Sequence, residues 1–159
     1  MILQLFVCIL FTTQIQSKEI SVDNAIADPN VKKYFLIALS TKSYKEAKSF
    51  ANKLSNQSSI VLNLRGLKVN NKIALTYSKQ ECVSDWGEYP CYIARGRYDD
   101  GIYISIERSD AYSGFKAGYY IVVVASGERS ISKSALKTIK PIVSDAYIKS
   151  SKVYMGCMH

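Results

Sequence analysis

Aromatic and basic side chains gather in one part of the sequence, between Trp86 and Tyr112. An aromatic ring offers a broad apolar face, and an arginine offers a planar fork that holds a carboxylate through two hydrogen bonds. Together these residue types suit the binding of an acidic sugar. The alternative is that the tyrosines cover a sheet face and the arginines solvate an edge strand. The residues that we expect to bind are Trp86, Tyr92, Arg95, Arg97 and Tyr103.

A hairpin is predicted to position this cluster. Residues 92–98 form a candidate strand, and residues 102–106 alternate isoleucine with other residues, which is typical of a half-buried strand. The turn signal Asp100-Gly101 joins the two. Side chains two apart on a strand share a face, so we expect Arg95 and Arg97 to face solvent together. A register slip of one residue would exchange the faces.

No set of residues in the sequence specifies catalysis. Asp99-Asp100 occupies a predicted turn, where aspartate is favoured by local backbone hydrogen bonds. Cleavage of a glycosidic bond needs two carboxyl groups at a set separation, and nothing fixes such a pair here. Cys157 and His159 offer only two ligands for a metal, an incomplete set. We therefore expect no enzymatic activity, no metal and no cofactor.

The N-terminal segment, residues 1–17, resembles a secretory signal peptide, because residues 1–11 are almost wholly apolar, residues 12–16 are mildly polar and Ser17 offers a small residue at the cleavage point. It is too short to span a membrane comfortably, although an uncleaved anchor is the alternative, since no Lys or Arg precedes the run. Cleavage would leave residues 18–159 as one domain, without a membrane span. The expected location is the periplasm or the exterior of the cell.

Three cysteines follow this segment: Cys82, Cys91 and Cys157. In an oxidising compartment two of them should pair. We expect Cys82 and Cys91 to form a disulfide, because they flank a turn-rich stretch that the bond would staple. Pairing of Cys157 with either of the others is the alternative.

The net charge of +8 favours an anionic partner: an acidic glycan, an anionic lipid, a nucleic acid or an acidic protein. The charges are scattered, and no long run of like charge occurs, so solubility alone is the alternative explanation. Because export separates the protein from nucleic acid, we expect no nucleic-acid partner.

Two apolar runs organise the chain. Residues 119–124 are aromatic or β-branched without charge, which suits a strand buried on both faces, and residues 34–40 have a similar pattern. Ser43 to Glu46 matches a capping box before a helix, and Pro141 is expected to kink or end a second helix. Further strands are predicted at residues 60–64, 73–77, 146–149 and 152–155.

The predicted fold class is therefore α+β. Two tandem β-α-β halves form a mainly antiparallel sheet with two helices on one face, plus an inserted hairpin. The halves resemble the SPOR (sporulation-related repeat) family, on the strand 34–40 with the helical residues 45–54, and on the strand 118–127. The resemblance implies a four-stranded antiparallel sheet with two helices, and binding of peptidoglycan glycan strands on the sheet. The segment between the two halves, residues 68–117, is longer than the SPOR resemblance implies.

Two functions agree with these features. The first is an exported cell-envelope module that binds peptidoglycan or another anionic glycan. The second is an exported inhibitor or immunity protein that binds an envelope-acting enzyme. An open groove lined by aromatic residues would favour the glycan, whereas a protruding loop with an apolar tip, centred on Trp86, would favour a protein partner.

Overall fold

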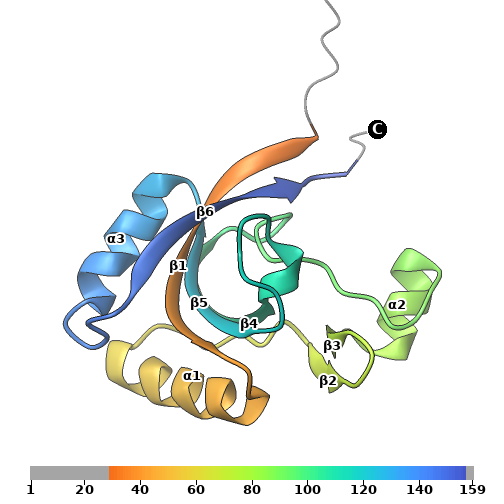
Figure 1. Cartoon of the computed structure of the whole chain (residues 1–159), viewed down its shortest axis with the longest axis horizontal. Helices are drawn as coiled ribbons and strands as arrows, with labels where there is room; N and C mark the ends of the chain where they lie inside the picture. The colour runs from red at the N-terminus through yellow and green to blue at the C-terminus, as the bar shows by residue number, and fades with distance from the viewer. Residues whose placement is uncertain (1–28, 157–159) are drawn as a thin grey trace, which may run out of the picture.

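The two apolar runs lie side by side at the centre of the main sheet in the computed structural model, which describes residues 29–156 (Figure 1). They are strands β1 and β5, and they pair antiparallel, with Tyr34 opposite Gly127 and Thr41 opposite Tyr120. The expected signal peptide, residues 1–17, and Cys157 lie outside the described residues. The described elements, in order, are β1 (Asn30–Thr41), α1 (Tyr44–Ser58), β2 (Lys68–Asn70), β3 (Ala74–Thr76), α2 (Lys79–Trp86), β4 (Gly101–Arg108), the short 3-10 helix η1 (Ser109–Ala111), β5 (Tyr120–Gly127), α3 (Arg129–Ile139) and β6 (Tyr147–Tyr154).

The main sheet is antiparallel and has the strand order β4-β5-β1-β6. Its strands and the helices α1 and α3 follow one another as β-α-β-β-α-β, a split β-α-β arrangement. The α+β prediction is thus confirmed. The two pieces predicted near the end of the chain form the single strand β6, which pairs with β1.

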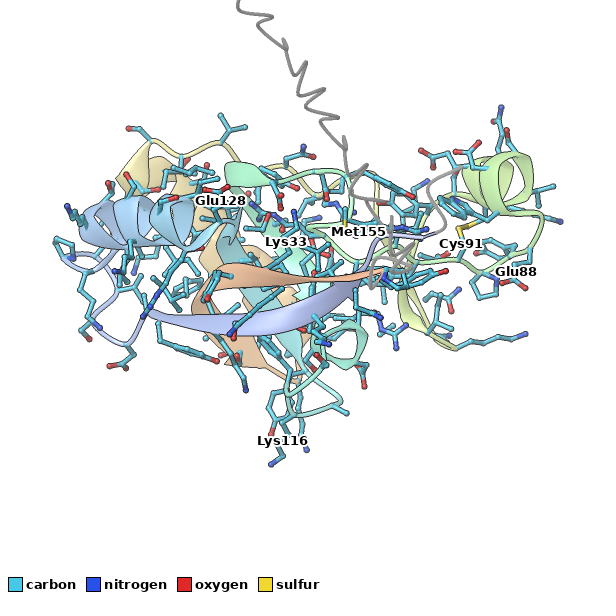
Figure 2. The ribbon with its side chains drawn as sticks, turned by 90° about the horizontal axis from the view of Figure 1, so that it is seen from above. Lys33, Glu88, Cys91, Lys116, Glu128 and Met155 are labelled. Atoms are coloured by element: carbon cyan, nitrogen blue, oxygen red, sulfur yellow. A yellow bond between two sulfur atoms is a disulfide. The ribbon has the colours of Figure 1, made fainter. Side chains whose placement is uncertain are left out.

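Both helices pack on one face of this sheet. Val122 and Val124 of β5 join buried residues of α1 and α3 in the larger core cluster. Ile121 and Val123 point to the opposite face, which we call the distal face, and pack there with Phe35, Ile37 and Tyr112. In Figure 2 the loop that carries Lys116 projects from the side of the sheet opposite α3. β5 is therefore buried on both faces, as its composition predicted.

Two predicted strands are absent from the described residues. Residues 60–64 make only one parallel bridge, between Leu62 and Ile104 of β4. Residues 92–98 are irregular, so the predicted hairpin around Asp100-Gly101 does not form. The strand after this turn, β4, pairs instead with β5. Apolar composition favoured strands in both segments. However, β5 pairs with one edge of β4, and residues 61–63 hydrogen-bond to Ile104 at its other edge, so Ile104 is not available to residues 92–98.

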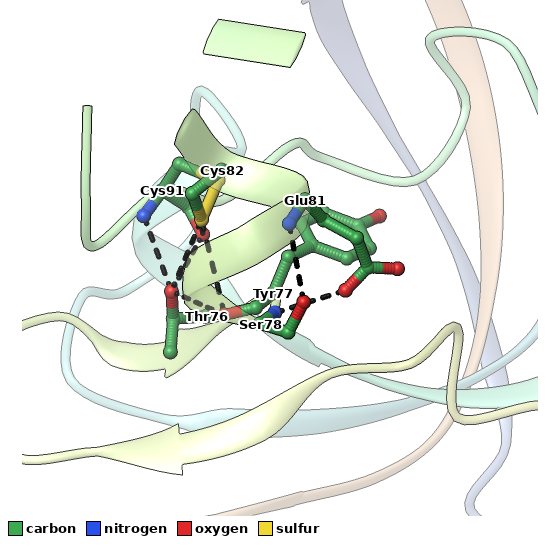
Figure 3. Close-up of a disulfide and its surroundings, with 6 residues drawn as sticks. All are labelled: Thr76, Tyr77, Ser78, Glu81, Cys82 and Cys91. Carbon is green, nitrogen blue, oxygen red and sulfur yellow. Dashed lines mark hydrogen bonds between the residues drawn. A yellow bond between two sulfur atoms is a disulfide. The ribbon is translucent and has the colours of Figure 1, made fainter. Parts of the chain in front are cut away.

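The hairpin that the structure does contain belongs to a projecting part of the molecule, residues 68–91, which we call the disulfide lobe (Figure 1). It comprises β2, β3 and α2. The first half of the expected turn-rich stretch, residues 83–86, belongs to helix α2, whereas residues 87–90 are bends. Helix α2 begins with a full capping box between Ser78 and Glu81 (Figure 3). This motif was present in the sequence as a serine followed three residues later by a glutamate.

The predicted capping box at Ser43 is half correct. Ser43 accepts a hydrogen bond from the backbone N–H of Glu46, but the Glu46 carboxylate accepts one from the hydroxyl of Thr41 instead. Helix α3 ends at Ile139, shortly before Pro141, as predicted. Among residues 29–156, no helix is long and apolar enough to cross a membrane.

Candidate functional site

Cys82 and Cys91 form a disulfide that closes the disulfide lobe. The bond joins α2 to the end of β3, because the backbone N–H of Cys91 donates to the Thr76 hydroxyl (3.1 Å) and its carbonyl accepts from the N–H of Tyr77 (3.1 Å). Figure 3 shows these groups together. The predicted pairing is correct, and it agrees with an oxidising environment.

Arg65 is the centre of a buried polar network that sequence reasoning missed. Its Nη1 lies 2.8 Å from Oε2 of Glu107, and its Nε lies 2.8 Å from Oδ2 of Asp99. Its Nη2 donates to the hydroxyl of Tyr77 (2.9 Å) and to a backbone carbonyl. Burial alone would lower the pKa of Arg65, but the negative charges of Glu107 and Asp99 raise it, so the guanidinium stays protonated. These partners come from distant parts of the chain, and no local pattern predicts their meeting.

Arg95 was expected to face solvent, and this prediction is wrong, since its exposed fraction is 0%. It donates to the hydroxyls of Ser105 (2.9 Å) and Ser126 (3.1 Å) and to the carbonyls of Tyr103, Val123 and Gly101. Its guanidinium also lies 3.5 Å from the ring centroid of Tyr103. Burial lowers the pKa of Arg95. A side chain used in this way holds residues 92–99 on the sheet and has no surface to offer a ligand.

Tyr92 and Tyr103 belong to the same interior network. Tyr92 donates to Oε2 of Glu107 (2.5 Å), and Tyr103 donates to Oδ2 of Asp99 (2.9 Å). Burial raises the pKa of both tyrosines, and the nearby carboxylates raise it further, so both hydroxyls keep their protons at neutral pH. Of the expected binding residues, these two and Arg95 therefore serve the interior.

Trp86 and Arg97, the other two expected binding residues, do meet at the surface. The guanidinium of Arg97 lies 5.5 Å from the Trp86 ring centroid, 5.0 Å from that of Tyr98 and 5.5 Å from that of Tyr154. Trp86, Tyr98 and Tyr154 are 43%, 69% and 50% exposed, respectively, as whole residues. We call these four residues the arginine-aromatic cluster. It combines the disulfide lobe, the irregular segment and the end of β6.

Arg97 keeps hydrogen-bonding capacity within this cluster. No carboxylate among residues 29–156 forms an ion pair with it, and its Nε has no hydrogen-bond partner there. A Cβ at Gly156 would collide with Nη2 of Arg97, so the glycine lets the guanidinium approach the backbone closely. Arg97 thus has no ion-pair partner among residues 29–156, and an arginine beside half-exposed rings has the kinds of group that can hold a carboxylate next to an apolar ligand face.

The distal face of the sheet is covered at its centre. The ring of Phe35 in β1 packs edge-on against Tyr112, with centroids 4.7 Å apart, and Tyr112 in turn contacts Phe115. Phe35, Ile37 and Tyr112 are consequently buried. The glycan-binding face implied by the SPOR resemblance is thus occupied, in its central part, by the protein's own loop.

An open cleft of about 200 Å³ lies beside this cover. Ser40, Ser109, Phe115, Lys116, Tyr119, Ile121, Tyr147 and Lys149 line it. Sequence reasoning missed this site as well, because its two lysines lie far apart in the chain and neither belongs to a charge run.

Comparison with family models, curated proteins and solved structures finds no match for this chain. The fold and the site define a disulfide-bonded α+β domain with a polar interior network and two surface groupings of basic and aromatic residues.

Proposed function

We propose that this protein is an exported module that binds an anionic glycan, with peptidoglycan as the first candidate. The observation that carries this proposal is the arginine-aromatic cluster. Arg97 supplies donors for a carboxylate, and the exposed rings of Trp86, Tyr98 and Tyr154 supply apolar faces against which sugar rings can pack. The apolar residues 1–17, the disulfide and the positive net charge agree with a role in the cell envelope.

The site proposed here differs from the one that the SPOR resemblance implied. Tyr112 and Phe115 cover the centre of the distal face, so a glycan strand has no continuous path across the sheet. The arginine-aromatic cluster is exposed and joins two of the residues expected to bind, Trp86 and Arg97. For both reasons we assign the glycan to the cluster.

Retention of the mature protein on purified sacculi tests the proposal. Wild type should co-sediment, and Trp86→Ala and Arg97→Ala should each lower retention severalfold. Arg129→Ala is the matched control. Arg129 is an exposed arginine of α3, and its guanidinium lies over a single aromatic ring, that of Tyr34. Retention should fall with added salt for wild type, since exposed charges are screened over about 8 Å at physiological ionic strength.

If Arg129→Ala lowers retention as much as Arg97→Ala does, the binding depends on net charge alone and not on the arginine-aromatic cluster. If wild type is not retained at any salt concentration, the glycan proposal is rejected.

A second candidate function, inhibition of an envelope-acting enzyme, is favoured by the shape of the disulfide lobe. The lobe projects from the sheet (Figure 1), and Val69, Val83, Trp86 and Tyr89 are 43–51% exposed on it. Exposed apolar residues on a projecting segment suit insertion into a partner's cleft. Retention on sacculi that persists in Arg97→Ala but is lost after protein is stripped from the sacculi would favour this candidate.

A further inference from the structure

The cleft at the edge of the distal face carries a concentration of positive charge. Lys116 and Lys149 line it, and Lys42 follows the end of β1 close by. The Nζ atoms of Lys42 and Lys116 lie 5.8 and 5.7 Å from the ring centroid of Tyr119, and that of Lys149 lies 4.6 Å from the centroid of Phe115. Three ammonium groups thus surround two neighbouring rings.

No carboxylate in the described part of the chain neutralises these charges through an ion pair. None of the three lysines forms an ion pair with a carboxylate of residues 29–156, and no Asp or Glu is among the residues that line the cleft. Like charges held near one another repel, and a bound anion would relieve that repulsion. The cleft therefore favours an anionic ligand more strongly than scattered surface lysines would.

The lining indicates what kind of anion fits. The cations are all lysines, which act as compact point charges and suit phosphate, whereas arginine forks suit carboxylates. A phosphomonoester carries a charge of about −1.5 to −2 at neutral pH and three acceptor oxygens, enough for several ammonium groups. Phe115, Tyr119 and Tyr147 add apolar walls, and a volume of about 200 Å³ suits a single ring with its substituent.

We infer that this cleft binds a phosphomonoester attached to a ring-shaped body such as a sugar. The site is separate from the arginine-aromatic cluster: none of the residues that line the cleft belongs to the cluster. Lys116 and Lys149 hold the phosphate, Lys42 adds long-range attraction, and the rings of Tyr119 and Tyr147 contact the ring of the ligand.

Titration calorimetry with glucose 6-phosphate tests this inference on the mature protein. Saturable binding is expected, weaker for glucose 6-sulfate, which carries one negative charge, and weaker still for inorganic phosphate, which lacks the ring. The double variant Lys116→Ala, Lys149→Ala should lower affinity at least about tenfold, as expected for the loss of charge-assisted hydrogen bonds.

The matched control is Lys45→Ala, Lys53→Ala, which removes the same charge from a shallow depression on α1. It should leave the affinity for glucose 6-phosphate within about twofold, because neither lysine is among the residues that line the cleft. A binding assay with vesicles that contain phosphatidylinositol 4-phosphate tests whether the natural ligand is a lipid headgroup or a soluble molecule. If glucose 6-phosphate competes with the vesicles for the protein, the cleft also binds the phosphorylated headgroup of the lipid.

Three outcomes would overturn the inference: no saturable binding of glucose 6-phosphate, equal binding of the sulfate ester, or equal losses in the two double variants. Thermal unfolding of both double variants without ligand should match that of wild type, which shows that any loss of affinity arises at the cleft. Should a variant unfold early, Lys116→Gln alone, at an exposed position on the loop, gives the same comparison.

Discussion

The Nη1 atom of Arg65 lies 2.8 Å from Oε2 of Glu107, and the side chains are only 8% and 0% exposed. This ion pair connects the irregular segment after α1 to strand β4. A buried pair contributes little net stability relative to apolar residues of similar size, but removal of one partner leaves a buried charge without compensation.

Arg65→Met is therefore expected to lower the free energy of unfolding by about 3–5 kcal/mol. Equilibrium unfolding in urea measures the loss. The double variant Arg65→Met, Glu107→Leu should lose less than the sum of the two single variants, because both charges are then gone. A single variant as stable as wild type would contradict the buried pair.

Arg95 and Arg97 should differ sharply when each is replaced by alanine. Arg95→Ala leaves several buried hydroxyl and carbonyl groups without their donor, so a loss of about 3 kcal/mol or more is expected. Arg97→Ala removes a half-buried side chain and its contacts with rings, and a loss of about 1 kcal/mol or less is expected. Urea unfolding of both variants under identical conditions gives the comparison. Similar losses would show that the two side chains do not differ in burial.

Stability should decline at alkaline pH because burial raises the pKa of Tyr92 and Tyr112 above the usual value of 10.0. Above pH 10 the unfolded chain releases these phenolic protons while the folded chain retains them. The unfolded state then binds fewer protons, so the free energy of unfolding falls as pH rises. The stabilisation that the two protonated tyrosines give to the folded state is fully present below pH 10. It is lost as the pH rises toward their raised pKa values.

Each such tyrosine can lower stability by up to about 1.4 kcal/mol per pH unit in that range. Chemical unfolding between pH 9 and 11.5 measures the slope. Tyr92→Phe should flatten it, whereas Tyr98→Phe, at a largely exposed ring, should not. Equal slopes in wild type and Tyr92→Phe would count against the raised pKa of Tyr92.

Val122→Asp should prevent folding, because Val122 is fully buried in β5 beneath the helices and the carboxylate would have no partner there. Circular dichroism and yield of soluble protein measure the outcome. Val61→Asp is the control, since Val61 is 70% exposed. Near-normal melting of Val122→Asp would show that β5 is not central.

Loss of the disulfide should act mainly on the lobe. For a loop with a sequence separation of 9, the double variant Cys82→Ser, Cys91→Ser is expected to lose about 2–3 kcal/mol. Hydrogen exchange should quicken in α2 and β3 more than in β1 and β5. Uniform acceleration across the sheet would instead indicate that the bond supports the whole fold.

The parts of the fold that sequence predicted were those with strong local patterns. The aromatic and β-branched run of β5 and the similar run of β1 indicate buried strands by composition alone, and Ser43 indicates the start of α1. The disulfide prediction rested on the expected oxidising compartment and on the short spacing between Cys82 and Cys91.

The candidate site could be predicted only in part. Trp86 and Arg97 meet as a surface pair, but the burial of Arg95 depends on β4 and β5, which approach it only in three dimensions. Alternation predicts a side chain's direction only within a strand, and residues 92–98 are not one. The pairing of Arg65 with Glu107 and the gathering of three lysines at the cleft are likewise contacts between distant segments.

The pairing of β1 with both β5 and β6 sets the order in which the protein can mature. Phe35 to Ile37 are fully buried, yet their partners lie at Val123 to Ser126 and at Tyr147 to Lys149, late in the chain. While the ribosome is still making those residues, β1 has no strand to pair with and its apolar side chains stay uncovered. The sheet therefore closes only after β6 has been made, and until then the buried side chains of β1 lack part of their cover.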